Sequence, residues 1–170
     1  MGECTLWTLG EYQGLLKKCI TSVKDRGQQA VAEELALLAA ETLAEKCPQI
    51  TRLQSSMAVP SSRQGQRFRG FSLAQKVEEE IRKRFELNEL PHSLRLQYRS
   101  SQKTSRGLGR EGRLSKALEK PEQGDGKERG SLLLVDDVVT TGGTMIRAIE
   151  QAKAQGFSEI CCFALAGVKS

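Results

Sequence analysis

The sequence predicts an α/β fold, in which a central and mostly parallel sheet is flanked by helices. Short apolar segments that suit buried strands recur along the chain, and they alternate with longer segments whose apolar residues lie three or four positions apart. With 170 residues, the chain suits a single domain and can bury a core without disulfides. Folds of this class bind ligands at the carboxyl ends of their strands.

In the first half of the chain we expect three helices and one strand. These elements span residues 12–24 (helix), 28–46 (helix), 53–59 (strand) and 72–85 (helix). Gly27 separates the first two helices, and Pro48 ends the second because proline cannot continue the helical hydrogen bonds. Ser72 and Gln75 form the capping box that starts the third helix.

In the second half we expect three strands and one helix. The strands span residues 94–99, 132–135 and 160–165, and the helix spans residues 143–155 with Gly156 as its C-cap. The first strand alternates apolar with polar residues, whereas the second is a continuous apolar run that suits burial on both faces. Residues 100–130 are rich in Gly, Ser, Lys, Arg and Glu, so we predict a mobile basic loop there.

Composition limits the classes of function. The five cysteines include no C-x-x-C pair, so neither a disulfide framework nor a zinc module is predicted, and reduced thiols are expected. His92 is the only histidine, which argues against multi-histidine metal sites and His-dependent triads. No apolar run approaches the ~20 residues of a membrane span, and no secretory signal pattern is present. We therefore expect a cytoplasmic protein without membrane contact.

The most informative segment runs from Leu132 to Thr144, where an apolar strand is followed by two acids and a loop of threonines and glycines. Glycines allow close approach of a ligand, and threonine hydroxyls with the free N–H groups of a helix start favour an anion, so we expect a phosphate there. The carboxylates of Asp136 and Asp137 can accept hydrogen bonds from vicinal hydroxyls about one sugar ring away. A phosphate next to a diol describes a ribose 5-phosphate.

Other interpretations of these patterns were weighed. A buried strand followed by a glycine-containing turn is also an ordinary α/β connection, in which the acids would cap the turn. The segment 107–112 satisfies the G-x-G-x-x-G pattern of dinucleotide sites, yet it follows a polar stretch instead of a buried strand. No segment matches the G-x-x-x-x-G-K-[ST] pattern of Walker-type ATPases, so that phosphate cradle is missing.

The run from Asp136 to Thr144 resembles the signature with which type I phosphoribosyltransferases bind phosphoribosyl pyrophosphate (PRPP). The rest of the chain is similar to the ComF family of competence-related proteins. Three segments carry this resemblance: the opening helices with Tyr12, Gly14 and Lys24, the V-P…R…R-x-R-G-F segment from Val59 to Phe71, and the basic loop with Gly107, Leu108, Arg110 and Arg113.

This resemblance implies a type I phosphoribosyltransferase fold, with a small hood at about residues 1–50 beside a core at about residues 51–170. It implies transfer or release of a 5-phosphoribosyl group, with Asp136 and Asp137 as catalytic acids at the ribose. The expected PRPP-binding residues are Asp136, Asp137, Val138, Val139, Thr140, Thr141, Gly142, Gly143 and Thr144. Mg²⁺ is the expected cofactor, held through PRPP and water and not by direct side-chain ligation.

The resemblance also implies a pyrophosphate site and a closing flap, both basic because guanidinium groups match phosphate oxygens. The pyrophosphate residues would be Ser61, Ser62, Arg63, Arg67 and Arg69. The flap residues, which would exclude water, would be Arg99, Lys103, Arg106, Arg110 and Arg113. For both groups a solvated basic loop is the alternative.

Two further functions stay open. A protein with a degenerate catalytic apparatus could instead sense PRPP or a nucleotide in DNA uptake or its regulation. The net charge of +5, concentrated between residues 63 and 113, also allows nucleic-acid binding, but aromatic residues are not interleaved as in many such modules. For this domain alone the expected partner is PRPP or another ribose 5-phosphate compound, and a homodimer is compatible with the sequence.

Overall fold

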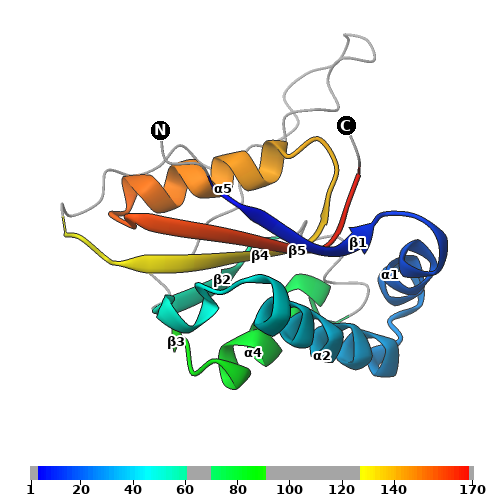
Figure 1. Cartoon of the computed structure of the whole chain (residues 1–170). Coiled ribbons are helices and arrows are strands. Elements are labelled where there is room, and N and C mark those ends of the chain that lie inside the picture. The colour runs from blue at the N-terminus through cyan, green and yellow to red at the C-terminus, as the bar shows by residue number, and fades with distance from the viewer. Residues whose placement is uncertain (1–3, 61–69, 91–126, 169–170) are drawn as a thin grey trace, which may run out of the picture.

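The computed structural model describes residues 4–60, 70–90 and 127–168 of the chain. In these residues five parallel strands form one sheet in the order β1-β5-β4-β2-β3 (Figure 1). The strands are β1 (Leu6–Glu11), β2 (Ser55–Ala58), β3 (Asn88–Glu89), β4 (Ser131–Val139) and β5 (Glu159–Gly167). The predicted α/β class with a parallel sheet is therefore confirmed.

Helices cover both faces of this sheet (Figure 1). On one face lie α1 (Gly14–Arg26), α2 (Gln29–Lys46) and α4 (Leu73–Arg84), and on the other lies α5 (Gly143–Ala154). A short 3-10 helix, η1 (Ile50–Arg52), connects α2 to β2. Among the helices of the described residues, none combines the length and apolar character that a membrane crossing requires.

The first half of β4 is buried on both faces and forms the centre of the core. Leu133 and Val135 belong to the cluster shared with α1, α2 and α4, whereas Leu132 and Leu134 belong to the cluster shared with α5. All four side chains are fully buried, and burial of each contributes roughly 1.5–3 kcal/mol to folding. The expected two-sided burial of this strand is confirmed, and it fixes the position of the residues that follow.

Local signals set the ends of several helices as expected. Gly27, with φ of 65°, ends α1, and the Ser72 hydroxyl at the start of α4 accepts the backbone N–H of Gln75 at 3.4 Å. At the end of α5 the cap is Gln155, and Gly156 follows it with φ of 96° instead of serving as the cap itself.

The N-terminal part of the chain differs from the expectation of a hood. Residues 6–11, to which no element was assigned, form β1 and pair with β5. Ile20 of α1 and Leu43 of α2 are fully buried in the same core cluster as Phe163 of β5. The segment before residue 50 thus supplies an edge strand and part of one helical layer, because its apolar side chains cover the sheet.

The bounds of the strands also differ from the expected ones. β2 begins at Ser55, two residues after the predicted start, because Leu53 still follows the turn of η1. β4 continues to Val139 and therefore contains the two acids that were expected to follow it. β3, with only two residues, was not predicted. The predicted strand at residues 94–99 lies outside the described residues, as do residues 100–126 of the predicted basic loop.

Candidate functional site

The end of β4, the loop to α5 and the last turn of α1 meet at one edge of the sheet. β4 ends at Val139, and α5 begins at Gly143 after a short loop. In Figure 1 this loop and α1 lie on the side toward which the strands point. Parallel α/β sheets bind their ligands at this edge, so the acids and the glycine loop lie where a site is expected.

The two acids of this site are not equivalent. Asp136 and Asp137 are neighbours near the carboxyl end of β4. Asp136 lies beside Ala164 in the pairing with β5, and Asp137 stands between this pair and the pair of Val138 with Ala166. Asp137 is buried and lies on the side of the sheet covered by α1, where Lys24 contacts it, whereas Asp136 is partly exposed.

Lys24 of α1 supplies a positive charge to Asp137. The Lys24 Nζ atom lies 2.6 Å from the Asp137 Oδ1 atom, and the two side chains are 29% and 12% exposed, respectively. This partial shielding from water makes their attraction stronger than that of a fully exposed ion pair. Lys24 also lies in the last turn of α1, where a basic residue is favoured by the helix dipole. Asp137 is thus held in position by a charge from another element.

Asp136 has a less favourable environment. Burial, followed by the charge of Asp137, raises the pKa of the Asp136 carboxyl from its ordinary value of 3.8 to about 7. The backbone N–H of Asp137 donates to the Asp136 Oδ1 atom at 2.7 Å, and this bond and the charge of Lys24 lower the pKa only in part. A carboxyl that the protein stabilises poorly in its charged form, at the edge where ligands bind, is a candidate binding or catalytic group.

The loop after β4 leaves the first turn of α5 open to an anion. Gly142, the N-cap residue, has φ of 75°, a conformation that residues with side chains rarely adopt. It has no side chain to cap the helix, and the first N–H groups of a helix lack partners within it. Thr140, Thr141, Gly143 and Thr144 around it are exposed. The helix supplies roughly half a positive charge at this end.

Val138 and Val139 support the loop from the core. Val138 packs against the cluster shared with α1, α2 and α4, and Val139 against the cluster shared with α5. The carbonyl oxygen of Val139 also accepts the backbone N–H of Val168 at 3.0 Å. These contacts hold the acids and the loop in a fixed relation, and they leave the two valines mainly their backbone for contact with a ligand.

The other predicted contacts lie outside the described residues. They are Ser61, Ser62, Arg63, Arg67 and Arg69 of the pyrophosphate group and Arg99, Lys103, Arg106, Arg110 and Arg113 of the flap. The strand that precedes the first group is well anchored, because the hydroxyl of Ser56 in β2 donates to Glu78 of α4 at 2.6 Å. Since β2 runs parallel to β4, the chain leaves the sheet after Ala58 at the same edge as the acids.

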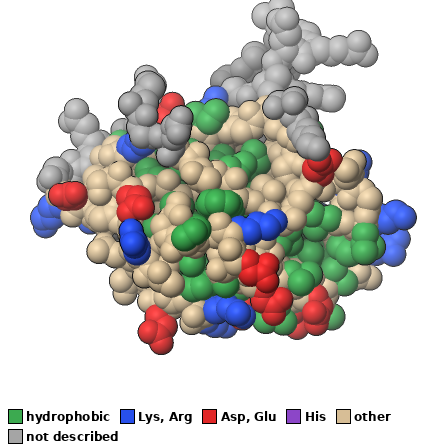
Figure 2. Space-filling model, viewed as in Figure 1, with side chains coloured by type: hydrophobic (Ala, Val, Ile, Leu, Met, Phe, Trp, Pro, Cys, Tyr) green, Lys and Arg blue, Asp and Glu red, His purple; other side chains and the backbone are tan. Residues whose placement is uncertain are grey.

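The distribution of charged side chains on the surface of the described residues can be compared with that of a nucleic-acid-binding protein. On the face shown in Figure 2, basic and acidic side chains are interspersed and form no continuous basic area. A nucleic-acid footprint would need such an area. The charge excess between residues 63 and 113 that suggested this alternative falls mostly outside the described residues.

Lys24 is the site residue to which the sequence assigned no role. It was noted only as part of the resemblance of the opening helices, and its role depends on a partner 113 positions away. The available local signal is its place directly after the fully buried Val23, at the border of the buried face of α1. That signal marks a residue near the core without naming its partner.

Donor atoms for a metal ion are few in the described residues. Within them, no group of three or more His, Cys, Asp or Glu side chains could hold a metal ion. The carboxylate oxygens of Asp136 and Asp137 can accept hydrogen bonds from the water ligands of a Mg²⁺ ion that phosphate oxygens hold. Comparison of the chain with protein-family models, with curated proteins and with solved structures gave no match. Function is therefore inferred from the geometry of the site.

Proposed function

We propose that this chain binds PRPP with Mg²⁺ and is a ComF-like phosphoribosyltransferase, which transfers or releases the 5-phosphoribosyl group. The observation that supports this most is the continuity of β4 with α5, where two acids are followed within one short loop by a left-handed glycine and a helix start without a side-chain cap. An acceptor for hydroxyl groups is then followed within a few residues by a site for an anion, which suits the hydroxyls and the 5-phosphate of one ribose. The parallel sheet is compatible with the type I fold that this proposal requires.

The 5-phosphate is assigned to the loop from Thr140 to Thr144. The N–H groups of the first turn of α5 can donate to phosphate oxygens, and the exposed threonine hydroxyls add further donors. An added Cβ atom at Gly143 would meet only the Thr141 Oγ1 atom, at the ordinary distance of 3.8 Å. The space above Gly143 is therefore open in the protein, and a phosphate can occupy it.

The ribose hydroxyls are assigned first to Asp136. Its carboxylate accepts the backbone N–H of Asp137, and its raised pKa means that additional donors would stabilise the charged form. Asp137 is already bound by Lys24. We therefore assign Asp137 a contact that is shared with Lys24, so that α1 helps to position the acid pair.

These residues suit a reaction in which positive charge develops on the sugar. In phosphoribosyl transfer the ribose C1 atom gains oxocarbenium character as pyrophosphate leaves, so orientation and electrostatic stabilisation are the main tasks of the protein. Anionic carboxylates at the end of β4 favour such a charge, and fixed N–H donors at α5 orient the ribose through its 5-phosphate. When bound with PRPP, Mg²⁺ supplies charge neutralisation at the pyrophosphate oxygens.

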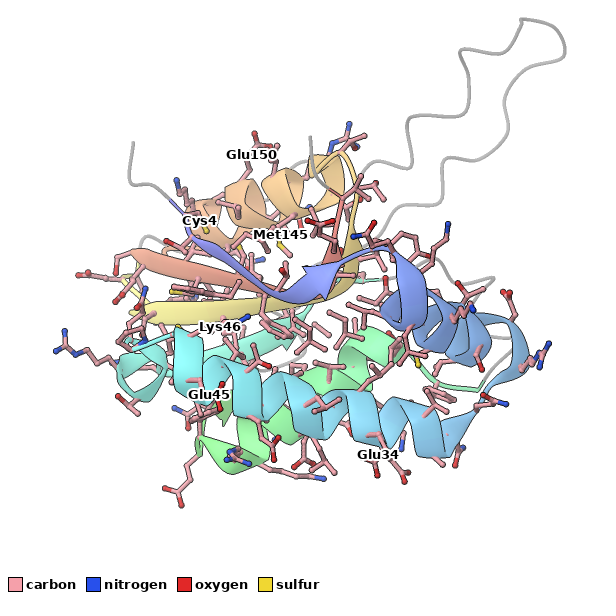
Figure 3. The ribbon with its side chains drawn as sticks, turned by 45° about the vertical axis from the view of Figure 1, so that its right-hand side comes forward. Cys4, Glu34, Glu45, Lys46, Met145 and Glu150 are labelled. Carbon is pink, nitrogen blue, oxygen red and sulfur yellow. The ribbon has the colours of Figure 1, made fainter. Side chains whose placement is uncertain are left out.

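The test compares the binding of PRPP with Mg²⁺ and of ribose 5-phosphate by calorimetry. Gly143→Ala should lower the affinity for both ligands at least tenfold, because the new methyl group enters the space of the shared 5-phosphate. The stability of the unliganded protein should not change. Glu150→Ala is the matched control: Glu150 is exposed about two turns further along α5 and points away from the sheet (Figure 3). This control should bind both ligands like the wild type.

Two results would contradict the proposal. Either the wild-type protein fails to bind PRPP, or Gly143→Ala leaves both affinities unchanged. Arg67→Ala adds a test of the pyrophosphate assignment, since it should weaken PRPP and spare ribose 5-phosphate. Release of pyrophosphate from bound PRPP in the presence of candidate acceptors or water separates a transferase from a sensor, which would bind PRPP without turnover.

A further inference from the structure

Two thiols lie side by side near the start of β1. The Sγ atoms of Cys4 and Cys162 are 3.2 Å apart, and Cys4 Sγ also donates to the carbonyl oxygen of Ile160 at 3.0 Å. Cys4 lies two positions before the start of the edge strand β1, and Figure 3 shows it on the side of the sheet where α5 lies. Cys162 is a residue of β5 and is almost fully buried in the cluster shared with α5.

Strand pairing holds these two thiols together. The backbone N–H of Cys162 donates to the carbonyl oxygen of Thr5 at 3.1 Å, and Leu6 is the pairing partner of Cys162 in the parallel ladder of β1 and β5. The approach of the sulfur atoms is therefore set by the register of the sheet. Formation of a bond of about 2.0 Å requires the sulfur atoms to move roughly 1.2 Å closer, and Cys4 can supply this movement because it lies before the first paired residue of β1.

The two thiols differ in reactivity. The hydrogen bond with Cys162 lowers the pKa of the Cys4 thiol to about 7, against the opposing effect of burial and with a smaller contribution from the charge of Lys153. The same hydrogen bond, together with burial, raises the pKa of Cys162. Cys4 is only partly buried. It thus has the thiolate character and access of a reactive cysteine, and Cys162 lies in position as the second thiol.

We propose that Cys4 and Cys162 are a site of reversible oxidation, at which a peroxide converts the two thiols into a disulfide that links the start of β1 to β5. The Cys4 thiolate attacks a peroxide oxygen, so that an S–O bond forms, the O–O bond breaks and hydroxide leaves. The sulfur of Cys162 then attacks the Cys4 sulfur, an S–S bond forms, and the S–O oxygen leaves as water with the proton of Cys162. Two thiols lose two electrons, and the peroxide is reduced.

The chain contains an internal control for this chemistry. Cys47 and Cys161 form a second pair of neighbouring thiols on the opposite face of the sheet, and burial is the main cause that raises the pKa of each, to about 11 for Cys161. These two thiols are buried. Because Cys161 and Cys162 are adjacent in β5, their side chains point to opposite faces, and Cys4 can reach only Cys162. Oxidation should therefore select one pair.

The test treats the full-length reduced protein with one equivalent of hydrogen peroxide, blocks the remaining thiols and maps the peptides without reduction. The expected product has lost two hydrogen atoms and contains the peptide of Cys4 joined to the peptide of Cys162. The link should be absent from Cys4→Ser and retained in Cys47→Ser. Because the bond would close 158 residues of chain, the melting temperature should rise by about 5–15 °C and return to its starting value after reduction.

Three outcomes would overturn the proposal. They are an unlinked product, oxidation of Cys4 alone, and a link between Cys47 and Cys161. Cys4→Ser changes a partly exposed residue outside the strands, so this variant should fold. A Cys162→Ala variant changes a buried residue, and if it fails to fold, peptide mapping of the wild type still decides the question. The oxidation can be measured without PRPP, so its outcome does not decide the proposed PRPP site.

Discussion

Asparagine substitutions of the two neighbouring acids should change stability in opposite directions. The charged carboxylate of Asp136 destabilises the folded state, and Asp136→Asn removes this destabilisation. The amide oxygen of the new asparagine can still accept the backbone N–H of Asp137. Asp137 forms the ion pair with Lys24, so Asp137→Asn leaves a partly buried Lys24 without this carboxylate. Opposite effects from adjacent residues are expected only if their surroundings differ as the structure indicates.

The magnitude for Asp136 follows from its pKa. The folded value of about 7 lies above the ordinary value of 3.8, so the folded state binds the proton more tightly than the unfolded state. The loss of stability caused by ionised Asp136 is therefore absent below the ordinary pKa of 3.8, grows as the pH rises toward 7 and is constant above it. Since a tenfold change in proton affinity corresponds to about 1.4 kcal/mol, the wild type should be less stable than Asp136→Asn by ~1–2 kcal/mol near pH 5 and by up to ~4 kcal/mol near pH 8.

The magnitude for Asp137 follows from the exposure of its ion pair. Breaking a fully buried pair costs about 3–5 kcal/mol and an exposed pair at most about 1 kcal/mol, so this partly exposed pair should cost ~1–3 kcal/mol. The comparison is cleanest near pH 5, because Asp136 is then protonated in the folded state and does not repel Asp137.

Urea unfolding of wild type, Asp136→Asn and Asp137→Asn at several pH values measures these differences. The single tryptophan, Trp7 in β1, packs against the core and reports unfolding by its fluorescence. The free energy of unfolding of Asp136→Asn should exceed that of the wild type increasingly from about pH 5 to about pH 8. If the difference in the free energy of unfolding is independent of pH, or if Asp136→Asn is the less stable protein near pH 8, the folded protein does not destabilise the charged form of Asp136 as we propose.

Two further predictions concern the same site. Lys24→Met should lower the free energy of unfolding by ~1–3 kcal/mol and weaken the binding of PRPP, whereas Lys24→Arg should retain most of the stability and of the affinity. Equal losses in the two variants would show that the charge of Lys24 is not the cause. Binding of PRPP near pH 7 should release up to about half a proton, because hydrogen-bond donors of the ribose favour the charged form of Asp136. Calorimetry in buffers of different ionisation enthalpy should show a smaller release at about pH 8.5. A release that stays constant with pH would exclude Asp136 as its source.

The sequence alone determined the central part of the fold. The run of Leu132, Leu133, Leu134 and Val135 is apolar without interruption, which suits only burial on both faces, and the structure buries all four residues. The Gly142-Gly143 pair and the helical pattern after it placed the start of α5 correctly. These features are predictable because the physical requirement and the residues that meet it lie within a few positions of one another.

The edge of the sheet could not be predicted in this way. The segment 6–11 contains a glycine and a mixed pattern of polar and apolar residues, and it becomes a strand through its pairing with β5, more than 150 residues away. β3 has only two residues and no pattern of its own. Such strands gain their stability from a partner that is already in place, so their local sequence carries little information.

For the candidate site, the sequence identified the residue types, and the tertiary structure decided their roles. Two adjacent acids and a glycine loop were evident in the chain, but both acids were assigned the same task. Only the packing of α1 against β4 brings Lys24 to Asp137 and leaves Asp136 to titrate near neutrality. The same is true of Cys4 and Cys162, which meet through the register of two strands. Charge pairing and thiol contact depend on distances of a few ångströms between residues far apart in the chain, and these distances exist only once the core has packed.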